Sequence, residues 1–190
     1  AVENGKIMKV GSDDEVNALA DAKTRRIDLA GKVLMPGMID THSHPVLAAL
    51  ASLGANLLDE EKPLPELEQW IIEQEQAGNT GDGAIVNIAG VSSAYWEQSS
   101  ELGKRFNQGR WADKPLVLNG IDGHTGWANN AMLKHANIDA AFVKNLPSKE
   151  RGYIGHGTDF TPTGFVAESM WDQVRGQVPP PSAQVMLKAA

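Results

Sequence analysis

The sequence predicts an α/β fold in which short buried strands alternate with helices. Three short apolar runs favour strands, at residues 33–39, where a Pro-Gly pair interrupts the run, at 84–89 and at 114–121. A clear helical pattern lies between the first two, over 65–77, where apolar residues recur every three or four positions. Strands that alternate with helices are typical of parallel sheets, whose carboxyl ends meet at one edge.

The start of the chain predicts a small β unit. The segment 2–10 has hairpin patterning with Asn4-Gly5 at its turn, a strong hairpin signal. Ser12 and Glu15 form a capping-box pattern, which predicts a short helix that ends near Ala22. The alternation of polar and apolar residues over 26–29 then predicts another strand.

Two histidines follow the strand predicted at 33–39. Side chains alternate along a strand, so His42 and His44 project to the same side, about 6 to 7 Å apart, from a rise of roughly 3.3 Å per residue. Neutral imidazoles so placed can bind one divalent ion such as zinc, and Pro45 ends the strand where an open site needs a loop. Two exposed polar residues are the plain alternative, but the buried strand and Asp40 favour a metal site.

A family resemblance rests on the run Leu34-Met35-Pro36-Gly37-Met38-Ile39-Asp40-Thr41-His42-Ser43-His44. It resembles the first barrel strand of the amidohydrolase superfamily of metal-dependent hydrolases. This implies a (β/α)8 TIM barrel with the histidines at its mouth. Residues 1–32 would be part of a small N-terminal β domain, and 33–190 the N-terminal portion of the barrel with an insertion. A complete barrel takes about 250 residues, so we expect the chain to be an N-terminal fragment.

The resemblance also implies a mechanism. One or two divalent ions, zinc by default, would activate a water for attack on an amide or related C–N bond. His42 and His44 would bind metal, and Asp40 would anchor the strand or orient a ligand histidine. In the family, two further histidines and an aspartate come from later strands, which this chain does not contain. We therefore expect the chain alone to be inactive and to bind metal poorly.

Two later segments resemble amidohydrolase family 3. Asp122-Gly123-His124-Thr125-Gly126-Trp127-Ala128-Asn129 is similar to its Asp-Gly-His segment, which implies that His124 faces the substrate or the metal centre and that Asp122 lies at the substrate site. Thr163-Gly164 followed by Glu168 is similar to its Thr-Gly-x-x-x-Glu segment, in which a glutamate replaces a metal-bridging carboxylated lysine. Glu168 can equally be a first-turn helix acid that favours the macrodipole.

The remaining segments leave alternatives open. Tyr95 and Trp96 follow the strand at 84–89 and either line a substrate pocket or cap the core. Gly81-Asp82-Gly83 predicts a turn before that strand. Asn129 predicts the cap of a helix over 130–136, and Ser182 the cap of a last helix.

The charge balance narrows the class of partner. Seventeen basic and 24 acidic residues give a net charge of −7 without a basic block, which disfavours nucleic acid and anionic membranes. A small amide-type substrate fits better. No apolar run reaches about 18 residues, and the absence of Cys excludes disulfides and thiolate metal sites. A cytoplasmic protein is the default expectation, with a signal peptide ahead of Ala1 left open.

Two rival functions remain on the sequence alone. One is a non-catalytic binding or regulatory protein on an amidohydrolase scaffold, since a fold does not fix a function. The other is a structural half-barrel with vacant histidines. An open half-barrel would leave strand edges and apolar helix faces uncovered, so we expect the chain to form a homo-oligomer or to recruit a missing C-terminal half.

Overall fold

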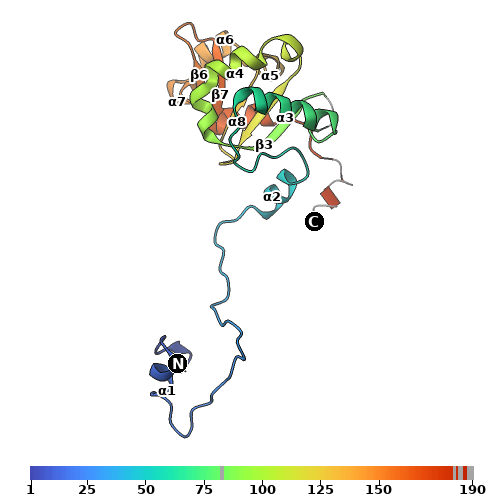
Figure 1. The fold of residues 1–190 in the computed structure, drawn as a ribbon. Helices are drawn as coiled ribbons and strands as arrows, with labels where there is room; N and C mark the ends of the chain where they lie inside the picture. The colour runs from blue at the N-terminus through green and yellow to red at the C-terminus, as the bar shows by residue number, and fades with distance from the viewer. Residues whose placement is uncertain (82–83, 182, 184–185, 188–190) are drawn as a thin grey trace. The chain divides into compact units, whose positions relative to one another are not determined.

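The protein is described here by a computed structural model that covers residues 1–190 except 82–83, 182, 184–185 and 188–190. The chain divides into two compact units, Ala1–His42 and Ser43–Ala190 (Figure 1). Two sequence predictions, the turn completed by Asp82-Gly83 and the helix cap at Ser182, lie outside the described residues.

The first unit begins with the predicted hairpin. Strands β1 (Val2–Glu3) and β2 (Lys6–Ile7) pair antiparallel. Asn4 and Gly5 both have positive φ, 50° and 75°, as a type I′ turn requires. The capping box is confirmed at the start of α1 (Asp13–Asn17), where Ser12 accepts from the Glu15 amide and Glu15 accepts from the Ser12 amide. The helix ends at Asn17, well before the predicted Ala22.

The strands predicted at 26–29 and 33–39 are wrong. Neither segment forms a strand, and the second is exposed rather than buried, with Val33 and Ile39 each 88% exposed. An extended backbone needs a neighbouring strand to pair its N–H and C=O groups. None of the strand pairings in the described part of the chain includes either segment. Apolar, β-branched composition supplies the propensity for a strand but not its partner.

The second unit is built on a five-stranded mixed sheet, which confirms the α/β class. In spatial order its strands are β3 (Val86–Val91), β4 (Leu116–Gly120), β5 (Thr125–Ala128), β7 (Pro162–Ala167) and β6 (Ile154–His156). The first pair, β3 and β4, is parallel, and every other pair is antiparallel. The predicted strands at 84–89 and 114–121 are thus confirmed as parallel neighbours.

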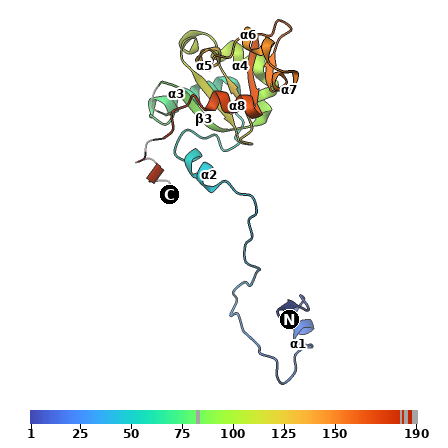
Figure 2. The same ribbon diagram turned by 180° about the vertical axis from the view of Figure 1, so that it is seen from behind.

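Helices cover both faces of this sheet. Leu116 and Leu118 face a core made with α3 (Leu64–Gln76) and α4 (Ser99–Phe106), whereas Val117 faces the opposite core, as alternation along a strand requires. The helices on that second side are α5 (Asn130–His135), α6 (Ala140–Asn145) and α8 (Glu168–Arg175). Figures 1 and 2 show α3 and α8 on opposite sides of the sheet.

Short elements connect these layers. Two 3-10 helices, η1 (Ser93–Gln98) and η2 (Gly109–Trp111), flank α4 on the path from β3 to β4. The helix α2 (Pro45–Ala51) opens the second unit, and α7 (Ser148–Arg151) precedes β6. Among the described residues, none of the helices combines the length and apolar character needed to cross a bilayer.

Asn129 fastens α5 to the strand layer. It is fully buried and, as predicted, caps α5 by accepting from the Met132 amide at 3.0 Å. The same oxygen accepts from the Leu116 amide of β4, also at 3.0 Å. Its Nδ2 donates to three backbone carbonyls, those of Phe106, Trp111 and Lys114. This one side chain therefore ties α4, η2 and α5 to the start of β4.

Candidate active site

Strand order brings two separately predicted segments to one end of the sheet. The loop after β4 carries Asp122 and His124 and returns directly into β5. Strand β7 pairs antiparallel with β5, and its last residue, Ala167, lies opposite Thr125. The next residue is Glu168, so its side chain and the His124 loop belong to the same edge.

His124 and Glu168 contact each other at this edge. The Nδ1 of His124 lies 3.4 Å from Oε2 of Glu168, and the Glu168 amide donates to the His124 carbonyl at 2.8 Å. Both side chains are open to solvent, 71% and 51% exposed, so an arriving molecule can reach them. The contact becomes an ion pair when His124 is protonated.

Asp122 orders the loop that carries His124. Its Oδ1 accepts from the amides of His124 and Thr125, each at 2.9 Å, and its Oδ2 accepts from the Thr125 hydroxyl at 2.7 Å. Partial burial, the largest single influence, raises the pKa of the Asp122 carboxyl, but these hydrogen bonds together outweigh it and hold the pKa below its usual value. Gly123, with φ of +72°, makes the tight turn between them.

The two aromatic residues predicted near the site have different surroundings. Tyr95 is 2% exposed and packs in the core, where its hydroxyl donates to the Lys62 carbonyl at 2.8 Å. Burial raises the pKa of the Tyr95 phenol. Trp96 is half-buried, its Nε1 donates to the Thr125 hydroxyl at 2.8 Å, and its ring lies 6.4 Å from that of Phe165. Of the two, Trp96 belongs to the His124 edge.

Asp40 and His42 belong to the first unit, and His44 belongs to the second. Asp40 accepts from the His42 amide at 3.0 Å within the first unit. His44 belongs to the second unit and precedes α2, and its carbonyl accepts from the Ala48 amide. Imidazole and carboxylate are suitable zinc ligands, so the donor chemistry of His42, His44 and Glu168 fits such an ion. In the described part of the chain no three His, Asp or Glu side chains converge as a metal site, so these ligands stay predictions.

Two features of this edge escaped the sequence analysis. Glu168 has φ of +50°, a left-handed conformation that is strained for a residue with a Cβ. The only local hint is its position between a β-rich segment and a helix. Thr125 joins Asp122 to Trp96, and the hint for it is the Asp-x-x-Thr spacing, in which the aspartate can accept from the later residue.

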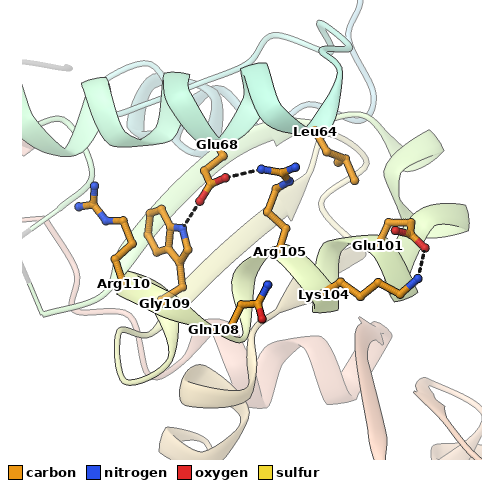
Figure 3. A pocket seen from close by; sticks show the side chains of 9 residues that line it. Leu64, Glu68, Glu101, Lys104, Arg105, Gln108, Gly109 and Arg110 are labelled. Carbon is orange, nitrogen blue, oxygen red and sulfur yellow. Dashed lines mark hydrogen bonds and ion pairs between the residues drawn. The ribbon is translucent and has the colours of Figure 1, made fainter.

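A surface cavity of about 640 Å³ lies elsewhere, between α3 and the α4–η2 segment (Figure 3). Its cations are already paired with carboxylates: Arg105 with Glu68, Lys104 with Glu101, and Arg110 with Glu75. These pairs neutralise the charge that would attract a ligand, so we place the candidate site at the His124 edge instead.

Comparison with known proteins identifies the family. A family model described as "Amidohydrolase family" matches residues 25–190. The exoenzymes regulatory protein AepA of Pectobacterium carotovorum subsp. carotovorum is 27% identical over 91% of this chain and 37% of its own length. Amidohydrolase YtcJ of Bacillus subtilis (strain 168) is 28% identical over 95% of this chain and 33% of its own length. N-substituted formamide deformylase of Arthrobacter pascens is 27% identical over 88% of this chain and 30% of its own length.

The chain therefore spans about a third of the length of these relatives, from 30% to 37%. No solved structure matches it. The family match covers most of the chain and includes the His42–His44 segment and the His124 and Glu168 segments. The resemblance inferred from those segments is confirmed: the chain belongs to the amidohydrolase family.

Proposed function

We propose that the protein is a metal-dependent hydrolase that cleaves an amide or related C–N bond with a metal-activated water. Family membership supports hydrolysis, and one relative is named for the deformylation of N-substituted formamides. The observation that carries the proposal is the contact of His124 with Glu168 at an exposed strand-end edge. The finer fold proposal is a (β/α)8 barrel in which the parallel pair β3 and β4 are neighbouring barrel strands.

His42, His44 and Glu168 are the residues that would hold the ion. When bound, a divalent ion, zinc by default, supplies a water whose pKa is lowered to about 7 and polarises a carbonyl group. Asp40 keeps the backbone of His42 in place through its hydrogen bond to the His42 amide.

His124 is proposed to act on the substrate itself. A protonated imidazole that directs Nδ1–H at Glu168 has Nε2–H left to donate. That donor can bind the substrate carbonyl oxygen as negative charge builds there. Asp122 holds the backbone of the loop in place, so less ordering of the loop that carries His124 is needed when the substrate binds.

The proposed substrate of this site is a small amide-type molecule, and nucleic acid or a membrane is not the proposed partner. The protein is proposed to be a homo-oligomer or to assemble with further barrel segments.

A second candidate function is a binding or regulatory role on the same scaffold. The observation that favours it is that one relative bears the name exoenzymes regulatory protein. Such a protein would bind a small molecule at the His124 edge without turning it over.

The test uses the product of the complete open reading frame and a panel of N-acyl and formamide substrates. Glu168→Gln keeps the size of the side chain but removes its charge, so we expect lower metal content and lower turnover. Asp172→Asn is the matched control, since Asp172 is an exposed acid of the same helix that pairs with Arg175 instead. Equal turnover in wild type and Glu168→Gln would contradict the proposed role. Ligand binding without turnover of any substrate would favour the regulatory function.

A further inference from the structure

Hydrogen bonds join three segments at the His124 edge into one network. Trp96 of η1 donates its indole N–H to the Thr125 hydroxyl at 2.8 Å. Thr125 donates that hydroxyl to Asp122 at 2.7 Å, and Asp122 accepts from the His124 amide at 2.9 Å. His124 accepts from the amide of Glu168 at 2.8 Å. The network therefore runs from the end of β3 to the start of α8.

The donors and acceptors of this network can be arranged in one way only. An indole N–H can only donate, and an ionised carboxylate can only accept. The Thr125 hydroxyl has a single hydrogen, which must point to Asp122, and this leaves its lone pairs for Trp96. The hydrogen bonds of Asp122 lower the pKa of its carboxyl, which keeps it in the acceptor form. Each member thus fixes the orientation of the next.

The loop has little room to adopt another shape. A Cβ added at Gly120 would lie 2.7 Å from the Thr125 carbonyl and 2.8 Å from the Asp122 carboxylate. The Trp96 ring also lies beside the ring of Phe165 in β7, at a centroid distance of 6.4 Å. A half-buried indole N–H that lost its acceptor would be costly, so the ring and the loop stabilise each other.

We propose that Trp96 is a positioning residue for His124. Through Thr125 and Asp122 it holds the loop backbone at the geometry in which His124 reaches Glu168. The proposal rests on the proposed function in one respect, that His124 is the group that acts on substrate. It assigns the indole N–H to the protein's own loop, whereas the sequence leaves open whether Trp96 lines a substrate pocket or caps the core.

The first experiment measures amide hydrogen exchange in this 190-residue chain, which requires no activity. Trp96→Phe keeps the ring contact with Phe165 but removes the indole donor, and Thr125→Val removes the hydroxyl at nearly the same size. Each change should speed exchange of the His124 amide by about two- to tenfold, the effect expected for one lost hydrogen bond. Thr125→Ser keeps the hydroxyl and should restore exchange to the wild-type rate.

Trp111→Phe is the matched control. Trp111 also donates its Nε1 at 2.8 Å, but to Glu68, which is paired with Arg105 beside the surface cavity (Figure 3). The Trp111→Phe substitution should lower the free energy of unfolding without a selective effect on hydrogen exchange of the His124 amide. Equal exchange at His124 in the Trp96→Phe and Trp111→Phe variants would overturn the proposal.

The second experiment measures hydrolysis by the product of the complete open reading frame. Trp96→Phe and Thr125→Val should lower kcat with KM nearly unchanged, and Thr125→Ser should retain kcat. Faster exchange at His124 with an unchanged kcat would overturn the positioning role. If the wild-type protein hydrolyses nothing, the proposed function fails, and the exchange rates alone then support or overturn the ordering of the His124 loop by Trp96.

Discussion

Replacing Glu168 with glycine should leave the protein more stable than replacing it with alanine. Glu168 has φ of +50°, where a Cβ costs about 1–2 kcal/mol. Glycine avoids that cost but loses about 0.5–1 kcal/mol through its greater freedom in the unfolded chain. Both variants lose the carboxylate and its contact with His124, so that loss cancels in the comparison. We expect Glu168→Gly to exceed Glu168→Ala by about 0.5–1 kcal/mol in free energy of unfolding.

The same pair of substitutions at Asp172 provides the control. Asp172 is an exposed residue inside α8, where glycine should be less stable than alanine by about 1 kcal/mol. Urea unfolding measures all four variants, with stability differences taken from the midpoints when the slopes agree. If glycine ranks below alanine at both positions, Glu168 is not strained and the reasoning fails.

A glycine variant at Glu168 that is more stable than the alanine variant would indicate that the strained backbone there serves the site. Strained backbone conformations persist where the surrounding structure holds a side chain that a site needs. The Glu168 amide is held by the His124 carbonyl, which keeps the carboxylate at the exposed edge. We therefore expect Glu168→Gly to be the more stable of the two variants and still to lose metal and turnover.

Three further outcomes are expected. His42→Ala and His44→Ala should each lower metal content and hydrolysis together, and unchanged metal in both by elemental analysis would remove these ligands. Asn129→Ala should cost at least about 3 kcal/mol in urea unfolding, because it leaves several buried backbone groups without a hydrogen-bond partner. Asn107→Ala, at a half-buried residue whose Oδ1 accepts from the Asn130 amide, should cost about 1 kcal/mol. Asp122 has a lowered pKa when folded, so its stabilisation is present above a pH of about 4 and is lost as pH falls through the lowered value. The stability gap between wild type and Asp122→Asn should therefore shrink on acidification, and a gap that grows in unfolding curves would contradict the sign.

Local patterns predicted the local structure well. The capping box at Ser12, the helix over 65–77 and the cap at Asn129 were each confirmed, because their causes lie within a few residues. The strands at 84–89 and 114–121 were confirmed as well, since apolar β-rich runs bounded by turn residues identify buried strands.

Features that depend on distant partners were predicted less well. The segment 33–39 has the composition of a buried strand, but pairing depends on a neighbour that the segment does not encode. His124 and Glu168 were each proposed separately, whereas their contact follows from β5, which pairs with both β4 and β7. The bond from Trp96 to Thr125 joins residues far apart in sequence, so no local spacing could reveal it.

The most direct test of metal-dependent hydrolysis is to remove and restore the ion in the product of the complete open reading frame. The protein is stripped with a chelator, titrated with zinc, and assayed on N-acyl and formamide substrates at each step. We expect turnover to disappear with the metal and to return in proportion to the zinc bound, with little recovery in the Glu168→Gln variant. Turnover that survives complete removal of metal would contradict the proposed mechanism.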